Sequence, residues 1–140
     1  MKYERAQAGV AEIALLLARQ LAGFSGDAVL VPVPTATSRV RARGYDHAAL
    51  LAREVSRLTN TPRRIVLRRV GQAHQVGSRR SQRLEQLQAA FRPVQVNEIR
   101  GRHIILIDDV LTTGATLEAA ARVLRRAGAA RVDAIVFAQA

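Results

Sequence analysis

The fold of this chain is decided by one stretch, which runs Ile104-Ile105-Leu106-Ile107-Asp108-Asp109-Val110-Leu111-Thr112-Thr113-Gly114-Ala115-Thr116. Its first four residues are branched and apolar, a pattern typical of a strand buried on both faces in the middle of a parallel sheet. The two adjacent carboxylates are expected to end that strand. A short threonine-rich turn follows, and then a helical pattern begins.

This order of strand, acids, turn and helix suits a phosphorylated sugar. Backbone N–H groups of the turn and of the helix N-terminus point at an anion, and threonine hydroxyls add donors. Gly114 lets the backbone approach closely because it has no Cβ. Glycine and threonine are also common in ordinary strand-to-helix turns, and an Asp pair can simply end a strand. Two acids, three threonines and a glycine in this order favour the phosphate site.

A second apolar run, Ala28 to Val33, predicts another buried strand, whose ladder Pro32 and Pro34 end because proline cannot donate a hydrogen bond. The loop from Thr35 to Tyr45 carries Arg39, Arg41 and Arg43 at alternate positions. Loops that leave the carboxyl ends of strands form the ligand crevice of α/β sheets. These guanidinium groups could therefore bind pyrophosphate oxygens in bidentate fashion. The alternative is an ordinary solvated loop.

Helical and extended patterns alternate along the rest of the chain. Helices are expected over 8–22, from an N-cap at Asp46 to a stop at Asn60, over 81–90, and from about Leu117 to a stop at Gly128. Short strands are expected over 65–67, 91–96 and 132–137. The segment 68–84 is long and polar, as functional loops often are. The alternation predicts a parallel α/β sheet with right-handed crossovers.

The composition fits a single domain. A chain of 140 residues, about half of them apolar, can fill one core, although only five residues are aromatic. There is no cysteine, which excludes a disulfide framework and a thiolate zinc site. No run approaches 18 apolar residues and the N-terminus has no secretory pattern, so we expect a cytoplasmic protein without a membrane partner.

The net charge is +11, and the basic residues are 21 Arg to one Lys. Such a balance indicates an anionic partner, either phosphates or a nucleic-acid backbone, or a general compositional preference for Arg. Arg53, Arg57, Arg122 and Arg125 lie on expected helices opposite the apolar stripes and are expected to be solvated. The few aromatic residues are scattered and cannot form a stacking platform. We therefore expect nucleic-acid affinity that is weak and non-specific.

The thirteen-residue stretch resembles the phosphoribosyl-pyrophosphate (PRPP) signature of the type I phosphoribosyltransferases. Within that superfamily the chain is most similar to the ComF/GntX competence-associated group, over about Tyr3 to Ala138. The supporting matches are Val31-Pro32-Val33-Pro34, Arg43-Gly44-Tyr45-Asp46-His47, Gln75-Val76-Gly77 and Thr112 to Ala121. Members often carry an amino-terminal Cys-rich zinc ribbon. This chain lacks one, so it is expected to be either a naturally short member or a fragment.

The resemblance implies one phosphoribosyltransferase domain over 1–140, a Rossmann-like parallel sheet flanked by helices, with a mobile loop and a minimal hood. Residues 1–27 would form the N-terminal helix and hood portion, and 28–140 the PRPP-binding core. The mobile loop would close over PRPP from the polar segment that contains Arg79 and Arg83. The resemblance also implies a homodimer.

The resemblance implies a role for each site residue. Asp108 and Asp109 contact the ribose hydroxyls, directly or through Mg²⁺ and its waters, and act in catalysis with Arg79 and Arg83. The pyrophosphate is expected at Pro34, Thr35, Ala36, Arg39 and Arg43. The 5′-phosphate loop comprises Val110, Leu111, Thr112, Thr113, Gly114, Ala115 and Thr116.

The implied reaction is a Mg²⁺-dependent transfer of the ribose 5-phosphate of PRPP to a purine or pyrimidine base, or the reverse, with release of pyrophosphate. Thr112 stands where enzymes for 6-oxopurines usually have Asp, so hypoxanthine and guanine are disfavoured and the acceptor stays open. The family commonly has Asn-Gln where this chain has Asp46-His47, whose role also stays open. Two alternatives remain: a non-catalytic regulator that binds PRPP or a nucleoside 5′-phosphate, and a nucleic-acid-associated accessory of competence.

Overall fold

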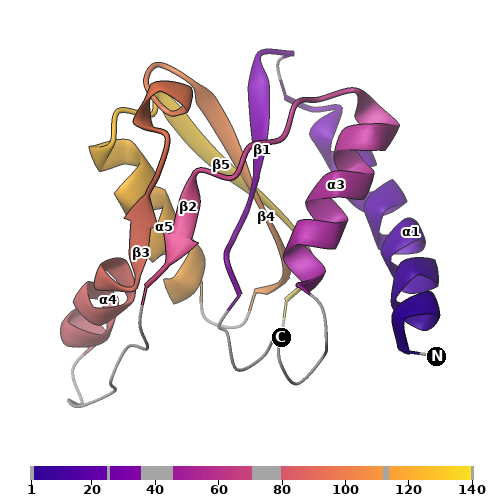
Figure 1. Ribbon diagram of the computed structural model, residues 1–140, viewed down its shortest axis with the longest axis horizontal. Helices are drawn as coiled ribbons and strands as arrows, with labels where there is room; N and C mark the ends of the chain where they lie inside the picture. Colours follow the sequence, from indigo (N-terminus) through magenta and orange to yellow (C-terminus); the bar gives the residue numbers. More distant parts are fainter. Residues whose placement is uncertain (1, 25, 36–45, 71–79, 112–113, 140) are drawn as a thin grey trace.

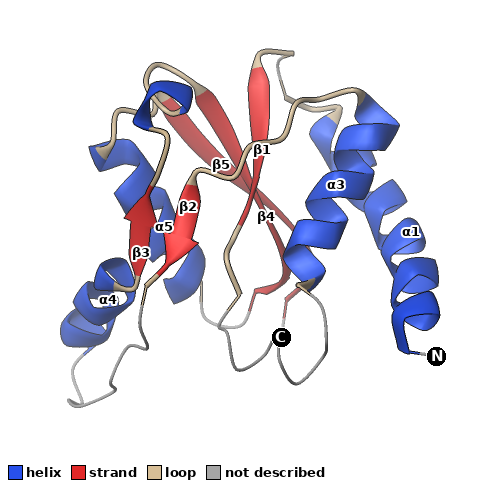
Figure 2. Cartoon of the chain, viewed as in Figure 1, coloured by secondary structure: helices blue, strands red, loops and turns tan. Residues whose placement is uncertain are grey.

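A central parallel sheet lies between two layers of helices in this computed structural model, which describes residues 2–24, 26–35, 46–70, 80–111 and 114–139 (Figure 1). The sheet has the order β1–β4–β5, with β1 at Ala28–Pro32, β4 at His103–Leu111 and β5 at Arg131–Gln139. Both strand pairs are parallel. The α/β class with a parallel sheet flanked by helices is therefore confirmed (Figure 2).

The middle strand β4 connects two separate hydrophobic cores. Ile104 and Leu106 belong to one core and Ile105 and Ile107 to the other, and all four have no exposed surface. The alternation follows from the strand itself, because successive side chains point to opposite faces. Burial of each branched side chain contributes about 1.5–3 kcal/mol. The four-residue apolar run thus anchors both layers, as the sequence predicts.

Helices α1 (Lys2–Leu21) and α3 (His47–Thr59) cover one face of the sheet (Figure 1). Asp46 is the N-cap of α3, where its Oδ1 accepts the backbone N–H of Ala49 at 3.2 Å. Asn60 ends this helix in the left-handed conformation, with φ of 59°. Both limits agree with the sequence prediction.

The other face carries α5 (Ala115–Arg126), α4 (Arg80–Ala89) and a small antiparallel pair of strands, β2 (Leu67–Arg69) and β3 (Phe91–Pro93). The 3₁₀ turn η1 (Val96–Glu98) leads into β4. Ala119, Ala120, Val123 and Leu124 of α5 are buried against the sheet. No helix within the described ranges has the length and apolar character needed to cross a membrane.

Several expected limits were wrong. The first helix starts before residue 8, and the strand expected over 65–67 is displaced, because Ile65 is 48% exposed. Arg63 forms a single parallel bridge with Leu30 instead, and β2 starts at Leu67. The strand expected over 91–96 ends at Pro93, because Gln95 adopts a positive φ of 51°. The division into a hood portion and a core stays a prediction.

Candidate functional site at the carboxyl edge of the sheet

The carboxyl ends of β1 and β4 meet at one edge of the sheet. The two strands are neighbours with Pro32 opposite Ile107, and the N–H of Val33 donates to the Ile107 carbonyl at 3.0 Å. Pro34 and Thr35 therefore leave β1 beside the point where β4 reaches Asp108. The structure thus brings together residues assigned from sequence to the pyrophosphate and to the ribose, although they lie far apart along the chain.

The Asp pair lies within β4, which corrects the expectation that the acids end the strand. Asp108 is half-buried and pairs with Val136 of β5, and the ladder continues to Leu111 opposite Gln139. The strand is longer because β5 extends beside it and supplies partners for the backbone of Val110 and Leu111. The backbone of Asp108 is therefore fixed by the sheet, and Asp109 lies within the same strand.

Gly114 links this strand to α5. It is the N-cap of the helix with φ of 78°, a left-handed conformation that favours glycine, and its carbonyl accepts the N–H of Glu118 at 2.9 Å. Ala115 and Thr116 follow in the first helical turn and are half-buried. The N-terminus of an α-helix attracts anions through its N–H groups and its dipole. The helix end expected to bind phosphate therefore follows directly from the β4 edge.

Asp46 connects the two ends of the loop between β1 and α3. The Thr35 hydroxyl donates to Asp46 Oδ1 at 3.0 Å, and the same oxygen caps α3. The hydroxyl proton of Thr35 is thus engaged within the protein, which leaves its backbone and its lone pairs for a ligand. The sequence predicts that Asp46 is an N-cap. It does not predict the hydrogen bond from Thr35, which forms because the fold brings Thr35 and Asp46 together.

Arg69 is a second residue at this edge that sequence reasoning missed. Its Nη1 donates to the Pro34 carbonyl at 3.3 Å, and its guanidinium lies over the Phe91 ring, 5.2 Å from the centroid. Arg69 and Phe91 are also opposite each other in the β2–β3 pair. Arg69 therefore joins the small sheet to the chain that leaves β1. In the sequence it looks like one more member of a polar segment.

The structure does not describe the side chains of several other residues that the sequence assigns to the site. Leu111, Val110 and Asp109 lie in β4 and Arg83 in α4, with side chains outside the described part. Of the residues assigned to the site from the sequence, those that lie wholly outside the described ranges are Ala36, Arg39, Arg43, Arg79, Thr112 and Thr113. Their assignments stay predictions.

The described carboxylates at this edge fit Mg²⁺ but do not form a closed cage. Among described residues no group of three or more His, Asp or Glu side chains is arranged to hold a metal ion. Mg²⁺ does not need one, because it keeps several waters and binds one or two carboxylates plus substrate phosphates. Asp108, within β4, provides hard oxygen donors of the right type. The donor chemistry is thus compatible with the expected ion.

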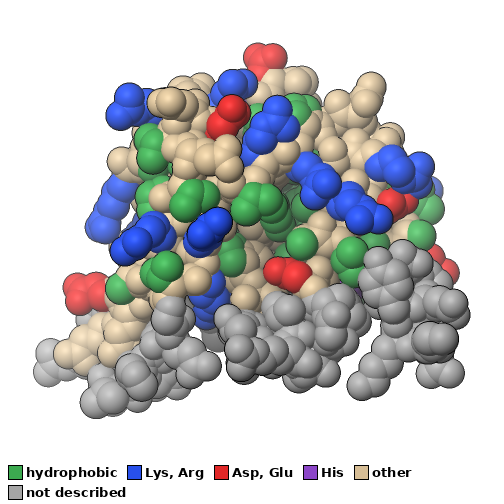
Figure 3. All heavy atoms as spheres, viewed as in Figure 1, with side chains coloured by type: hydrophobic (Ala, Val, Ile, Leu, Met, Phe, Trp, Pro, Cys, Tyr) green, Lys and Arg blue, Asp and Glu red, His purple; other side chains and the backbone are tan. Residues whose placement is uncertain are grey.

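Charge elsewhere on the described surface is dispersed. On the face drawn in Figure 3, basic side chains are spread over the described surface, some of them next to one another, with acidic and apolar groups among them. Arg53, Arg57, Arg122 and Arg125 are exposed on their helices, as expected. On α3, the hydrogen bond that Arg57 donates lowers the pKa of Glu54. This arrangement resembles solvated helix faces more than a nucleic-acid groove.

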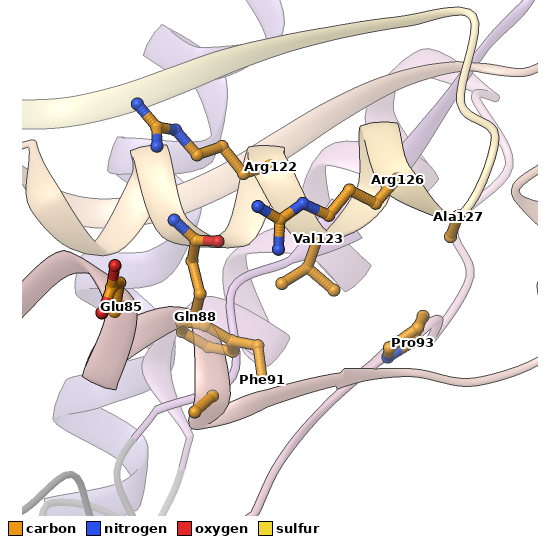
Figure 4. Close-up of a pocket in the computed structure, with 9 residues that line it drawn as sticks. Glu85, Gln88, Phe91, Pro93, Arg122, Val123, Arg126 and Ala127 are labelled. Atoms are coloured by element: carbon orange, nitrogen blue, oxygen red, sulfur yellow. The ribbon is translucent and has the colours of Figure 1, made fainter.

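A hollow of about 680 Å³ lies between α4, β3 and α5 (Figure 4). Phe91 and Pro93 form part of its lining, and Arg126 extends over Val123 above them. None of its lining residues was assigned to substrate from the sequence. We therefore place the candidate site at the carboxyl edge, where the phosphate turn and the acids lie.

The family model for the phosphoribosyl transferase domain matches residues 4–140. The chain belongs to the phosphoribosyltransferase family. Within it, the relatives place the chain in the ComF group: it is 39% identical to competence protein ComFC of Bacillus subtilis over 73% of its length, and 34% identical to competence protein F of Haemophilus influenzae over 79%. It spans 40% and 50% of those two proteins, respectively.

Two further comparisons concern enzymes. A segment of 46 residues, 32% of the chain, is 57% identical to adenine phosphoribosyltransferase of Mycobacterium avium and covers 26% of that protein. Glutamine PRPP amidotransferase of B. subtilis superimposes with a TM-score of 0.65 over 93% of this chain and 26% of that chain. The identity to the amidotransferase is 17%, so that likeness shows the fold alone.

Proposed function

We propose that this phosphoribosyltransferase-family chain binds PRPP and transfers its ribose 5-phosphate to a ring nitrogen of a base, or catalyses the reverse, with release of pyrophosphate. One observation carries the proposal: the pairing of β1 with β4 brings Pro34 and Thr35 to the sheet edge that holds Asp108 and leads into α5. A ligand with a phosphate at one end and a pyrophosphate at the other matches that order of groups.

The ligand is oriented by the two loops. Its 5′-phosphate binds the turn that ends at Thr116, where backbone N–H groups and the helix dipole favour an anion. Its ribose hydroxyls donate to the carboxylates of Asp108 and Asp109. Its pyrophosphate lies along the backbone of Pro34 to Ala36, with Arg39 and Arg43 as further donors. Mg²⁺ held at the acids, directly or through water, would neutralise charge on the leaving group.

In the reaction the bond between C1 of the ribose and the pyrophosphate oxygen breaks, and a bond from C1 to the base nitrogen forms. Positive charge builds on C1 and the ring oxygen as the leaving group departs, as in glycoside cleavage. The carboxylates of Asp108 and Asp109 stabilise that charge through space. Arg79 and Arg83 donate to the departing pyrophosphate, whose negative charge increases.

The names of two relatives favour a second candidate. Both are called competence proteins, so the same site in this chain could sense PRPP or a nucleoside 5′-phosphate in DNA uptake without turnover. The segment shared with an adenine phosphoribosyltransferase favours the enzyme. Because the chain spans half or less of the competence relatives, activity, acceptor and partners are proposed for this domain alone.

Calorimetry with Mg·PRPP tests the binding site that both candidates share. The parent is expected to bind PRPP, and the double variant Asp108→Asn with Asp109→Asn is expected to lose binding while its unfolding midpoint stays near the parent value. Glu118→Gln is the matched control, because it removes an exposed carboxylate from α5, the helix that follows β4.

A screen for pyrophosphate release across free purine and pyrimidine bases follows. Release with one base identifies the acceptor, whereas binding without release for any base identifies a regulator. Absence of heat with folded parent protein at millimolar ligand refutes the proposed site. Submicromolar binding of single-stranded DNA that persists at physiological salt, and that Mg·PRPP does not displace, would favour the nucleic-acid role instead.

A further inference from the structure

Three consecutive residues that leave β1 are each held by a different element of the fold. Val33 donates its N–H to a carbonyl of β4 at 3.0 Å, and the Pro34 carbonyl accepts from a guanidinium of β2 at 3.3 Å. The Thr35 hydroxyl donates to Asp46 Oδ1, at the N-cap of α3, at 3.0 Å. The segment 33–35 is therefore fixed from three sides, although it belongs to neither a strand nor a helix.

The third of these anchors, Asp46, holds two groups at once. The oxygen that accepts from Thr35 also accepts the N–H of Ala49 at 3.2 Å, so one carboxylate oxygen fixes both the start of α3 and a side chain of the loop. Thr35 and Asp46 are half-buried, and they are 11 positions apart in the sequence. The contact therefore joins the segment that leaves β1 to a helix that is itself packed on the sheet.

This hydrogen bond decides which atoms of Thr35 remain for a ligand. A hydroxyl has one proton, and Asp46 accepts it. The hydroxyl therefore cannot also donate to a pyrophosphate oxygen. The backbone N–H of Thr35 has no hydrogen-bond partner within the described part of the chain. The donor that Thr35 retains for an anion is thus its main-chain N–H, and its side chain holds the segment that carries this donor.

We propose that Asp46 is a positioning residue for pyrophosphate: through the Thr35 hydroxyl it fixes the backbone on which the leaving group of PRPP lies. The inference rests on the proposed function, because it concerns the same edge of the sheet. Asp46 acts through Thr35 and needs no contact with the ligand. A fixed donor binds an anion more tightly than a mobile one, because the entropy of ordering the segment is lost on folding rather than on binding.

The acceptor oxygen of Asp46 matters for this role, and its negative charge does not. An asparagine side chain also has an Oδ1 that accepts hydrogen bonds, so it can cap α3 and hold Thr35 in the same way. A carboxylate near pyrophosphate adds repulsion between like charges, which asparagine removes. Asp46→Asn is therefore expected to bind Mg·PRPP at least as tightly as the parent does, and Asp46→Ala is expected to bind it more weakly.

Calorimetric titration with three ligands tests the proposal. Mg·PRPP and magnesium pyrophosphate both carry the pyrophosphate group, whereas ribose 5-phosphate has the sugar and the 5′-phosphate without it. Thr35→Val replaces the hydroxyl with a methyl group of similar size. A typical hydrogen bond corresponds to about two- to tenfold in an equilibrium constant, so Thr35→Val should weaken binding of the first two ligands by that factor. Its affinity for ribose 5-phosphate should equal that of the parent.

A conservative variant and a double variant separate positioning from general destabilisation. Thr35→Ser keeps the hydroxyl and should bind all three ligands as the parent does. Asp46→Ala should lose affinity for the two ligands that carry pyrophosphate and keep its affinity for ribose 5-phosphate. In the Asp46→Ala background, Thr35→Val should cause no further loss, because the hydrogen bond between the two residues is already absent.

Thr59→Val is the matched control, because it makes the same chemical change at the other end of α3. The Thr59 hydroxyl is also half-buried, and it donates to the Val55 carbonyl at 2.7 Å. Thr59 is the last residue of the helix and lies about 18 Å along it from the first. The control should leave all three affinities unchanged, and circular dichroism should show that every variant is folded at the temperature of the titration.

The proposed function and this inference fail in different ways. A folded parent that binds neither Mg·PRPP nor magnesium pyrophosphate overturns both. If the parent binds Mg·PRPP, the inference alone is overturned when Thr35→Val binds it equally well, or when Thr35→Val loses affinity for ribose 5-phosphate by the same factor. Binding by Asp46→Asn that is as weak as binding by Asp46→Ala also overturns it, because the charge would then be what matters.

Discussion

Arg69→Ala is expected to destabilise the protein by about 2 kcal/mol, because one side chain makes two contacts between separate parts of the fold. A guanidinium over an aromatic ring contributes about 0.5–1 kcal/mol when exposed and about 2 when desolvated, and Arg69 is half-buried. The hydrogen bond to the Pro34 carbonyl has a charged donor, which is worth about 1.5–3 kcal/mol in good geometry. At 3.3 Å it is long, so about 1 kcal/mol is the appropriate figure.

A double-mutant cycle in urea unfolding isolates the contact between guanidinium and ring. Arg69→Ala, Phe91→Leu and their combination are compared, and we expect a coupling of about 0.5–1 kcal/mol. Arg69→Lys is the matched variant: it keeps the positive charge and loses the planar group that stacks on the ring. It should lose about half of the stabilisation.

The same variants are then titrated with Mg·PRPP. The Pro34 carbonyl is one of the groups that Arg69 holds, so we expect Arg69→Ala to weaken binding several-fold and Phe91→Leu to weaken it less. Two results would refute the reasoning. In one, the effects of Arg69→Ala and Phe91→Leu on the free energy of unfolding add within about 0.3 kcal/mol. In the other, Arg69→Lys unfolds at the same urea concentration as the parent.

Further predictions concern four single positions. Asp46→Ala should cost about 1–2 kcal/mol through loss of the α3 cap, whereas Asp46→Asn should cost only a few tenths because Asn also caps, and equal losses in urea would contradict this. The Arg57 hydrogen bond lowers the pKa of Glu54, so the small stabilisation from this pair should be present above the ordinary pKa of 4.5 and lost as pH falls through the lowered value. Parent and Glu54→Gln should then become equally stable in strong acid, and a difference that persists there would count against the pair. Gly128→Ala should cost about 1–3 kcal/mol, because φ is 110° and a Cβ would lie 3.0 Å from a neighbouring side chain. Gly9→Ala should instead stabilise α1 by about 0.5–1 kcal/mol, because a Cβ added there would meet nothing within 4 Å, and thermal melts that rank the two changes otherwise would refute both.

The main sheet was predictable because each of its features depends on a single local pattern in the sequence. Four branched apolar residues from Ile104 to Ile107 fit only a strand buried on both faces, and the helices beside it show regular apolar spacing. The cap at Asp46 follows from local chemistry, since a carboxylate at an N-cap is favoured whatever surrounds it. The cap at Gly114 was not predicted, because the apolar spacing indicates a helix only from about Leu117.

The small sheet and the contacts of Arg69 were not predictable in the same way. β2 and β3 have three residues each and only one buried side chain apiece, Leu67 and Phe91, so no alternating pattern marks them. The contacts of Arg69 depend on how two distant segments meet, which no local pattern records. For the same reason, the hydrogen bond from Thr35 to Asp46 could not be predicted, because it depends on where β1 and α3 lie in the fold.

The pairing of β1 with β4 has a consequence for synthesis on the ribosome. Ala28 lies opposite His103, so β1 has no partner strand until most of the chain has been translated. At about 5–20 residues per second, β1 waits for several seconds without its partner strand, and the apolar side of α1 has only α3 to pack against during that time. Pairings between residues so distant in sequence also form slowly. A nascent chain that stalls before residue 103 therefore leaves Leu30 and Val31 without the strand that lies beside them in the native sheet, and we expect such chains to be bound by chaperones or degraded.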